Sequence, residues 1–185
     1  WLSVRHRGLI SRVIERSTYL GNSLPGIVVA LALITVSIRF LPVAYQSTGL
    51  LLVSYAILFM PLSMVNIRAT LVQIPPTFDD VARSLGARPV AVLCRITLPL
   101  MTRGLGAGAA LVFLAVVTEL TATLLLAPIG TETLATRFWA NAASLAYGAA
   151  APYAVLMVMI SAPAAYLLNR QSNQRQGRTE RKRAM

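Results

Sequence analysis

Four long apolar stretches limit what this chain of 185 residues can fold into. They cover residues 25–41, 49–65, 104–127 and 152–168. A run of about 20 apolar residues is the length that crosses a bilayer as a helix. A soluble core can bury one such stretch but hardly four. The sequence therefore predicts an all-α fold, a polytopic membrane bundle with about four transmembrane helices in the lipid bilayer.

The positions of the basic residues predict how the chain is oriented. The net charge is +11, and all basic residues except Arg39 and Arg137 lie in residues 1–22, 66–103 and 170–185. Positive charge beside a membrane span stays in the cytoplasm. Both termini and the 66–103 loop are therefore expected there. Because the charge flanks membrane spans in this way, we expect no nucleic-acid partner.

The chain divides into three parts. Residues 1–22 form a basic lead-in on the cytoplasmic side, residues 23–169 form the transmembrane domain, and residues 170–185 form a basic tail that we expect to be disordered. The first residue is Trp1 and no signal peptide precedes it. We therefore expect a fragment, or the back half of a longer polypeptide.

A charged strip, "DDVARSLGARPVAVLCRITLPL", interrupts the apolar sequence at residues 79–100. Pro75 and Pro76 end the second span, and the spacing of Thr77 and Asp80 predicts a capping box at a helix start. One face of this helix is apolar and the other carries the Asp79–Arg83 pair at i, i+4. The apolar face comprises Phe78, Val81, Ala82 and Leu85.

Three further residues predict how the strip ends. Gly86 is expected at the left-handed position after the first helix. Pro89 then starts a second short helix, and Pro99 ends or bends it before the third span. The strip is thus a short amphipathic helix held across the membrane surface. It either transmits movement from a partner or merely connects two spans.

The strip resembles the EAA motif of importer-type ABC transporter permeases. That motif reads Glu-Ala-Ala, three residues, Gly, nine residues, Ile-x-Leu-Pro. Here Asp80-Val81-Ala82 is followed at the same spacing by Gly86 and by Ile96-Thr97-Leu98-Pro99. The resemblance implies a MetI-like permease fold, with residues 74–99 as a coupling loop that contacts an ATP-binding subunit. The implied contact residues are Asp79, Asp80, Ala82, Gly86, Ile96, Leu98 and Pro99.

Three other segments look like the second half of ferric-iron importer permeases. They are "YLGNSLPGIVVALAL", "QIPPTFDDVARSLG" and "TELTATLLLAPIGTETLATRFW". In those permeases two such halves commonly share one polypeptide. Their pattern Lys-Glu-Leu-Pro-Ala-Thr corresponds here to residues 118–123, where the lysine and the proline are replaced by threonine.

The resemblance implies ATP-driven import, with ferric iron as substrate, across a bacterial inner membrane. The implied partners are a dimer of ABC ATP-binding subunits, an extracytoplasmic substrate-binding protein and a second permease half or subunit. Related permeases for thiamine, polyamines, phosphonates or sulfate share this loop, so these substrates are alternatives. A structural membrane scaffold is the alternative outside transport.

Two features of the third span stand out. Glu119 is an acid at membrane depth, where charge is costly and usually faces a pathway or a partner. It either lines the translocation path or makes a structural hydrogen bond to a Ser, Thr or Asn on a neighbouring helix. Gly104 and Gly108 form a GxxxG pattern, which predicts close helix packing.

An enzyme is not expected. The chain lacks the phosphate-binding pattern GxxxxGK[ST], and its only lysine is Lys182. His6 and Cys94 are the only residues of their types, so neither a metal site nor a nucleophilic triad can be assembled. We expect no cofactor and no metal, and ATP hydrolysis in a separate subunit.

Overall fold

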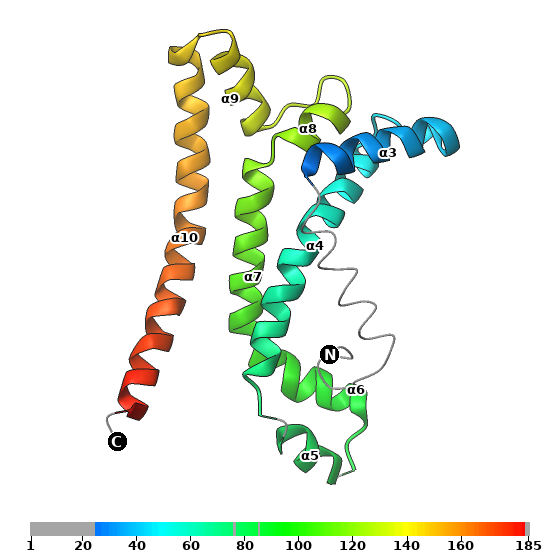
Figure 1. The fold of residues 1–185 in the computed structure, drawn as a ribbon. Coiled ribbons are helices and arrows are strands. Elements are labelled where there is room, and N and C mark those ends of the chain that lie inside the picture. Colours follow the sequence, from blue (N-terminus) through cyan, green and yellow to red (C-terminus); the bar gives the residue numbers. More distant parts are fainter. Residues whose placement is uncertain (1–24, 76, 85, 184–185) are drawn as a thin grey trace.

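The computed structural model describes residues 25–75, 77–84 and 86–183, except for the side chains of Asp79, Asp80, Arg83, Pro89, Arg103 and residues 167–183. The predicted lead-in over residues 1–22 lies outside the described residues. Within them every regular element is a helix or a helical turn (Figure 1). The all-helical fold class is therefore confirmed.

The helices follow one another with short connections. In chain order they are α3 (Gly26–Phe40), η1 (Pro42–Ala44), α4 (Thr48–Val72), α5 (Thr77–Ser84), α6 (Pro89–Val92), η2 (Leu93–Thr97), α7 (Leu98–Thr118), α8 (Thr121–Leu126), α9 (Leu134–Ala143) and α10 (Tyr147–Arg183). η1 is a 3₁₀ turn, whereas η2 is a π-helical turn.

Two described helices are long and apolar enough to cross a membrane: α4, and the Tyr147–Tyr166 part of α10. A third crossing is possible if Val90–Thr102 and Gly104–Thr118 count as one span, because a bend of 61° separates them. α3 is also apolar but has 15 residues. At 1.5 Å per residue it reaches about 22 Å, which is less than the roughly 30 Å of the hydrocarbon core.

The prediction of one continuous span over residues 104–127 is wrong. α7 ends at Thr118, and α8 begins only at Thr121. Glu119 between them has an extended backbone, with φ −70° and ψ 120°. The chain therefore leaves the axis of α7 at the acidic residue.

The bend into the third span also differs from expectation. Pro99 neither ends the helix nor marks the bend, because the helical backbone continues from η2 through Pro99 into α7. The 61° bend falls beside Gly104.

The bundle has two distinct ends (Figure 1). α5 and α6 lie at one, which we call the loop end, and α3, α8 and α9 lie at the other, the far end. At the loop end, Leu71 and Ile74 pack with Met101. At the far end, Ala30, Leu51, Ala122 and Leu126 form a second buried cluster, which joins α3, α4 and α8.

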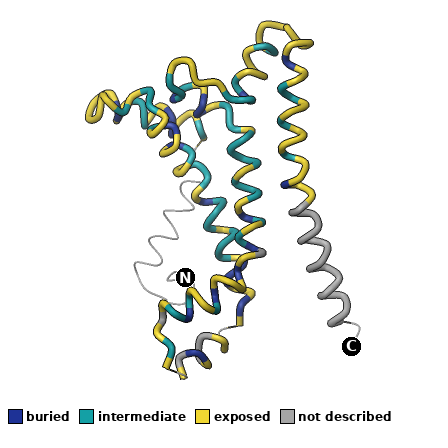
Figure 2. Tube along the Cα trace, turned by 180° about the vertical axis from the view of Figure 1, so that it is seen from behind, coloured by how far each residue is buried: buried dark blue, intermediate teal, exposed yellow. Residues whose placement is uncertain are grey.

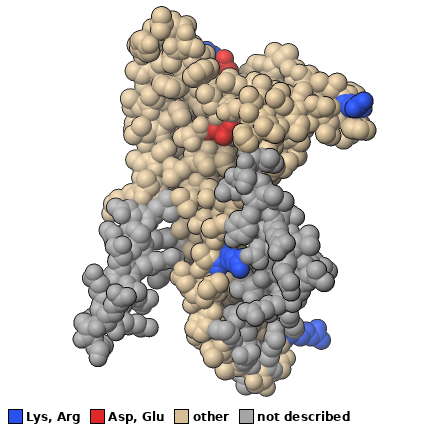
Figure 3. All heavy atoms as spheres, viewed as in Figure 1, with Lys and Arg blue, Asp and Glu red and all other residues tan. Residues whose placement is uncertain are grey.

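The outer surface is apolar and largely exposed. α10 shows mostly exposed residues along its described length (Figure 2). On the face drawn in Figure 3, charged side chains of the described residues occupy only a few isolated positions. Such a surface is stable in contact with lipid tails, as expected for a membrane bundle.

The last helix extends further than the apolar sequence. α10 continues to Arg183, through most of the segment for which the sequence predicts a disordered tail. Gln, Arg, Glu and Lys, which are common in this segment, are good helix formers.

Candidate functional site: the loop between α4 and α7

α5 carries the amphipathic pattern predicted from the sequence. It starts at Thr77, directly after the prolines, and ends at Ser84. The predicted capping contact of Asp80 and the predicted Asp79–Arg83 pair concern side chains outside the described residues.

Gly86 stops α5 by a Schellman turn. Its φ is +79°, a left-handed conformation that glycine adopts without strain. The Ala87 amide donates to the Ala82 carbonyl over 3.0 Å, which is the characteristic bond of this motif. The left-handed position expected from the sequence is therefore present.

The loop exposes apolar side chains at the loop end. Phe78 is 48% exposed and Val81 59%, and both lie on the apolar face of α5. Ala82 on the same face is buried, and so is Val92 on α6. We call Phe78, Val81 and Val90, which is 71% exposed, the apolar strip. An exposed aromatic and two valines on short helices form a surface that another protein can cover.

The second half of the motif spans the end of η2, with Ile96 and Thr97, and the start of α7, with Leu98 and Pro99. Ile96 is half-buried, whereas Leu98 and Pro99 are exposed. Thr97 between them is fully buried, and sequence reasoning did not single it out. The motif residues therefore lie in α5, at Gly86, in η2 and at the start of α7.

α7 and α4 approach most closely at the two glycines of the GxxxG pattern. A Cβ added to Gly104 would lie 2.1 Å from Thr70 Oγ1, and one added to Gly108 would lie 3.1 Å from Asn66 Cβ. A side chain at Gly104 would overlap Thr70. This contact fixes α7 against α4 a few residues after the loop.

Glu119 lies at the far end, where the chain turns from α7 into α8. Its Oε1 accepts a hydrogen bond from the Ala122 amide over 2.9 Å and lies 3.6 Å from where a Cβ of Gly26 would be. The carboxylate thus sits beside the N-termini of α8 and α3, where negative charge is favourable. Its observed bond is local, rather than to a Ser, Thr or Asn of a neighbouring helix.

A hydrogen-bonded pair links α8 to α4 next to this turn. Thr123 Oγ1 donates to the Glu119 carbonyl over 3.0 Å and lies 2.5 Å from Tyr55 Oη. Because the threonine hydroxyl has a single hydrogen, the Tyr55 hydroxyl is the donor in the second bond. The pair holds the break between α7 and α8 in place.

Comparison with known proteins identifies the family. The family described as binding-protein-dependent transport system inner membrane component matches residues 1–176. Over 170 residues the chain is 36% identical to the Fe(3+)-transport system permease protein FbpB 2 of Haemophilus influenzae. That alignment covers 92% of this chain and 34% of the relative, so the chain spans about a third of the relative's length.

The chain belongs to this family of inner-membrane transport components.

As a member of the family, the chain is a permease component of a binding-protein-dependent transport system. The recognition made from the EAA-like spacing is therefore confirmed. Within the described residues, no group of three His, Cys, Asp or Glu side chains lies close enough to hold a metal ion. The described arrangement instead comprises the exposed apolar strip, a helix bundle and grooves between helices.

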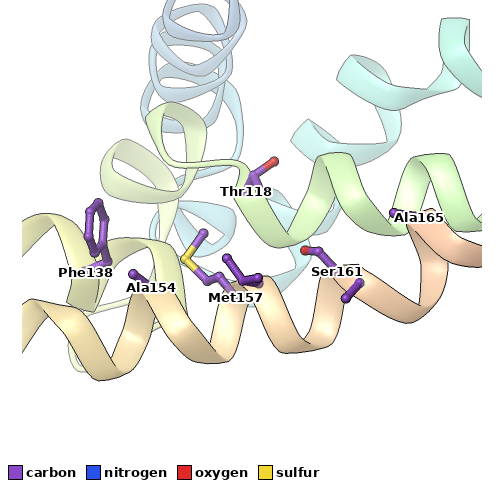
Figure 4. A pocket seen from close by; sticks show the side chains of 8 residues that line it. Thr118, Phe138, Ala154, Met157, Ser161 and Ala165 are labelled. Carbon is purple, nitrogen blue, oxygen red and sulfur yellow. The ribbon is translucent and has the colours of Figure 1, made fainter.

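Two apolar grooves run along the permease helices. One, of about 480 Å³, lies between α7, α9 and α10 and is lined among others by Phe138, Met157 and Ser161 (Figure 4). The other, of about 510 Å³, follows the α4–α7 contact past Gly104 and Gly108. Neither groove has a charged lining residue among those described.

Proposed function

We propose that this permease is the membrane subunit of an ATP-driven importer for ferric iron and that it docks on separate ATP-binding subunits through the loop between α4 and α7. The exposed apolar strip carries the docking proposal. An aromatic side chain left half-exposed on an eight-residue helix is typical of a surface that a partner covers. Gly86 sets the angle at which α5 is presented.

The energy source belongs to another chain. Without GxxxxGK[ST], these 185 residues have no loop to cradle the phosphates of ATP. ATP binding closes the dimer of ATP-binding subunits, and this closure displaces the loop. Because α7 follows the loop directly and packs on α4 at Gly104, movement of the loop is passed to the helices that enclose the path. Hydrolysis then resets the permease.

The positions of the basic segments in the sequence support an orientation of the permease in the membrane. The loop end and both ends of the chain face the cytoplasm, and α8 and α9 face outward. A substrate-binding protein delivers its cargo at the far end. A second permease half or subunit completes the path.

The substrate assignment comes from the similarity to the Fe(3+)-transport permease of Haemophilus influenzae. Iron is here the cargo of the permease. Uptake of radiolabelled ferric iron, measured against thiamine, sulfate, phosphonate and polyamine as competitors, tests it. Uptake that thiamine or sulfate abolishes and ferric iron does not would contradict the iron assignment.

Docking is tested by co-purification of the ATP-binding subunit with the permease. We expect Phe78→Ala with Val81→Ala to weaken the complex about tenfold or more. Ile129→Ala is the control, because Ile129 is an even more exposed apolar residue that lies at the far end. Equal retention of the ATP-binding subunit by the double variant and the control would contradict docking through the apolar strip.

A further inference from the structure

One buried hydroxyl in this permease has no hydrogen-bond partner. Thr97 is 0% exposed, and its Oγ1 is the buried side-chain atom left unsatisfied among the described residues. Other serines and threonines in the described helices donate to a carbonyl three or four residues earlier; they include Thr35, Ser37, Ser54, Ser63, Thr70, Thr102 and Thr118. A buried group of this kind is rare and costly, so its persistence needs a reason.

Thr97 closes the π turn η2, which explains why its hydroxyl lacks the usual partner. In this turn the Leu98 amide donates to the Leu93 carbonyl, five residues back. In an α-helix the hydroxyl of Thr97 would donate to that same carbonyl, as Thr70 does to Asn66. The wider turn withholds this bond.

Pro99 gives a physical cause for the wide turn. It has no N–H to donate, and in a regular α-helix its ring would press on the Arg95 carbonyl four residues earlier. Widening the preceding turn relieves that contact. π turns of this kind are uncommon inside helices and are frequent at functional positions.

The π turn η2 connects the loop to the helix bundle. Upstream lie α5, Gly86 and α6, which carry the apolar strip. Downstream, α7 is held against α4 where Gly104 meets Thr70. A change in the helical register of η2 therefore moves the loop relative to a fixed α7.

We propose that η2 is a register joint and that Thr97 is its positioning residue. This proposal rests on the proposed docking of the loop to ATP-binding subunits. When those subunits close, η2 changes from a π turn to an α-turn, and Thr97 Oγ1 gains the Leu93 carbonyl as acceptor. An α-turn closes with one residue fewer than a π turn. The change of register therefore rotates the loop by about 100° around the helix axis and shifts it by about 1.5 Å relative to α7.

The two registers compensate one another. The π turn relieves the proline contact but leaves the hydroxyl unsatisfied. The α-turn satisfies the hydroxyl but restores the contact. Because each register has one penalty, the difference between them is small enough for a docked partner to decide.

Replacing Thr97 distinguishes a role in the register joint from a role in packing alone. Thr97→Val removes the unsatisfied hydroxyl at nearly constant volume, so we expect an unchanged or higher melting temperature. Valine removes the hydrogen bond that favours the α-turn. We therefore expect transport, and the ATP hydrolysis that the permease stimulates in the ATP-binding subunits, to fall about tenfold. The affinity of the permease for those subunits should stay unchanged. Thr97→Ser keeps the hydroxyl and should behave as wild type. Thr102→Val, which removes an exposed hydroxyl already bonded to Pro99, should also be neutral.

Spin labels report the register in a permease that keeps Thr97. One label occupies the native Cys94, which is exposed in η2, and the other an introduced Thr102→Cys in α7. The label separation should differ between the nucleotide-free and the ATP-trapped complex. In the Thr97→Val variant it should stay at the nucleotide-free value in both.

An identical label separation in both states of an actively transporting wild-type complex would overturn the joint and leave the proposed function intact. Normal transport by Thr97→Val would do the same. Failure of the wild-type permease to bind any ATP-binding subunit would instead overturn the proposed function, and the joint with it.

Discussion

Gly104 and Thr70 lie so close that no side chain fits between their helices. A Cβ at Gly104 would lie 2.1 Å from Thr70 Oγ1 and 2.3 Å from Thr70 Cγ2. Real contacts of this kind are well above 3 Å, so either α7 or α4 would have to move. The contact holds the start of the third span, shortly after the loop in which Phe78 and Val81 are exposed.

Gly104→Ala should therefore loosen the bundle. Overpacking of this kind typically costs about 1–3 kcal/mol, and we expect a lower melting temperature in detergent. Gly106→Ala is the matched control, because a Cβ at Gly106 meets nothing within 4 Å. It should leave the melting temperature unchanged or raise it.

Removing the Thr70 side chain tests the same contact on α4. Thr70→Gly removes the atoms that a Cβ at position 104 would meet, so combining it with Gly104→Ala should restore part of the lost stability. Purely additive losses in the double variant would mean that the two residues do not share this contact.

At Gly86 the backbone conformation, rather than the space around the residue, limits which residues fit. A Cβ there has no neighbour within 4 Å, but φ is +79°. A β-branched residue in this conformation is strained by about 1–2 kcal/mol, so Gly86→Val should misplace α5 and abolish uptake while the permease still inserts. Gly86→Asn should keep most of the uptake, because asparagine tolerates this conformation. Normal uptake by Gly86→Val would count against the docking role of the loop.

Tyr55 and Thr123 should act as a coupled pair in stability. Tyr55→Phe removes the donor to Thr123 Oγ1, and a hydrogen bond of this kind contributes about 0.5–1.5 kcal/mol. Thr123→Val removes the acceptor from a fully buried position. Unfolding measured for both single variants and the double variant should show that the losses are not additive. Strict additivity would contradict the bond.

Glu119 should contribute mainly to the stability of the permease rather than to the translocation path. Glu119→Leu removes the acceptor for the Ala122 amide, and losing such a helix-end contact typically costs about 1 kcal/mol. Glu119→Gln keeps an acceptor oxygen, so its melting temperature and its uptake should remain near wild type. Uptake lost in Glu119→Gln at an unchanged melting temperature would instead assign the carboxylate to the translocation path.

The apolar stretches and the glycine and proline positions predicted most of the helices. The ends of α3 and the Gly86 stop follow from local rules, because proline fixes φ and glycine permits the left-handed conformation wherever they occur. The loop was located by its charged residues, by the prolines that bracket it and by the EAA-like spacing from Asp80 to Pro99.

The break at Glu119 and the π turn at Thr97 were not predictable in the same way. Residues 104–127 are almost uniformly apolar, and no proline or glycine marks the place where α7 ends. The break depends on contacts of α8 with α3 and α4, which are remote in sequence. Thr97 looks like an ordinary helical threonine, and only the register of the surrounding turn distinguishes it.

The central claim, that the loop between α4 and α7 faces the cytoplasm and docks on an ATP-binding subunit, can be tested at Cys94. This is the only cysteine of the 185 residues, and it is exposed at the loop end. Its modification by a membrane-impermeant thiol reagent is measured in intact cells and in inverted membrane vesicles, with Cys94→Ser as the background. We predict no modification in cells, rapid modification in vesicles, and protection when the ATP-binding subunit is added. Modification of Cys94 in intact cells would contradict the account.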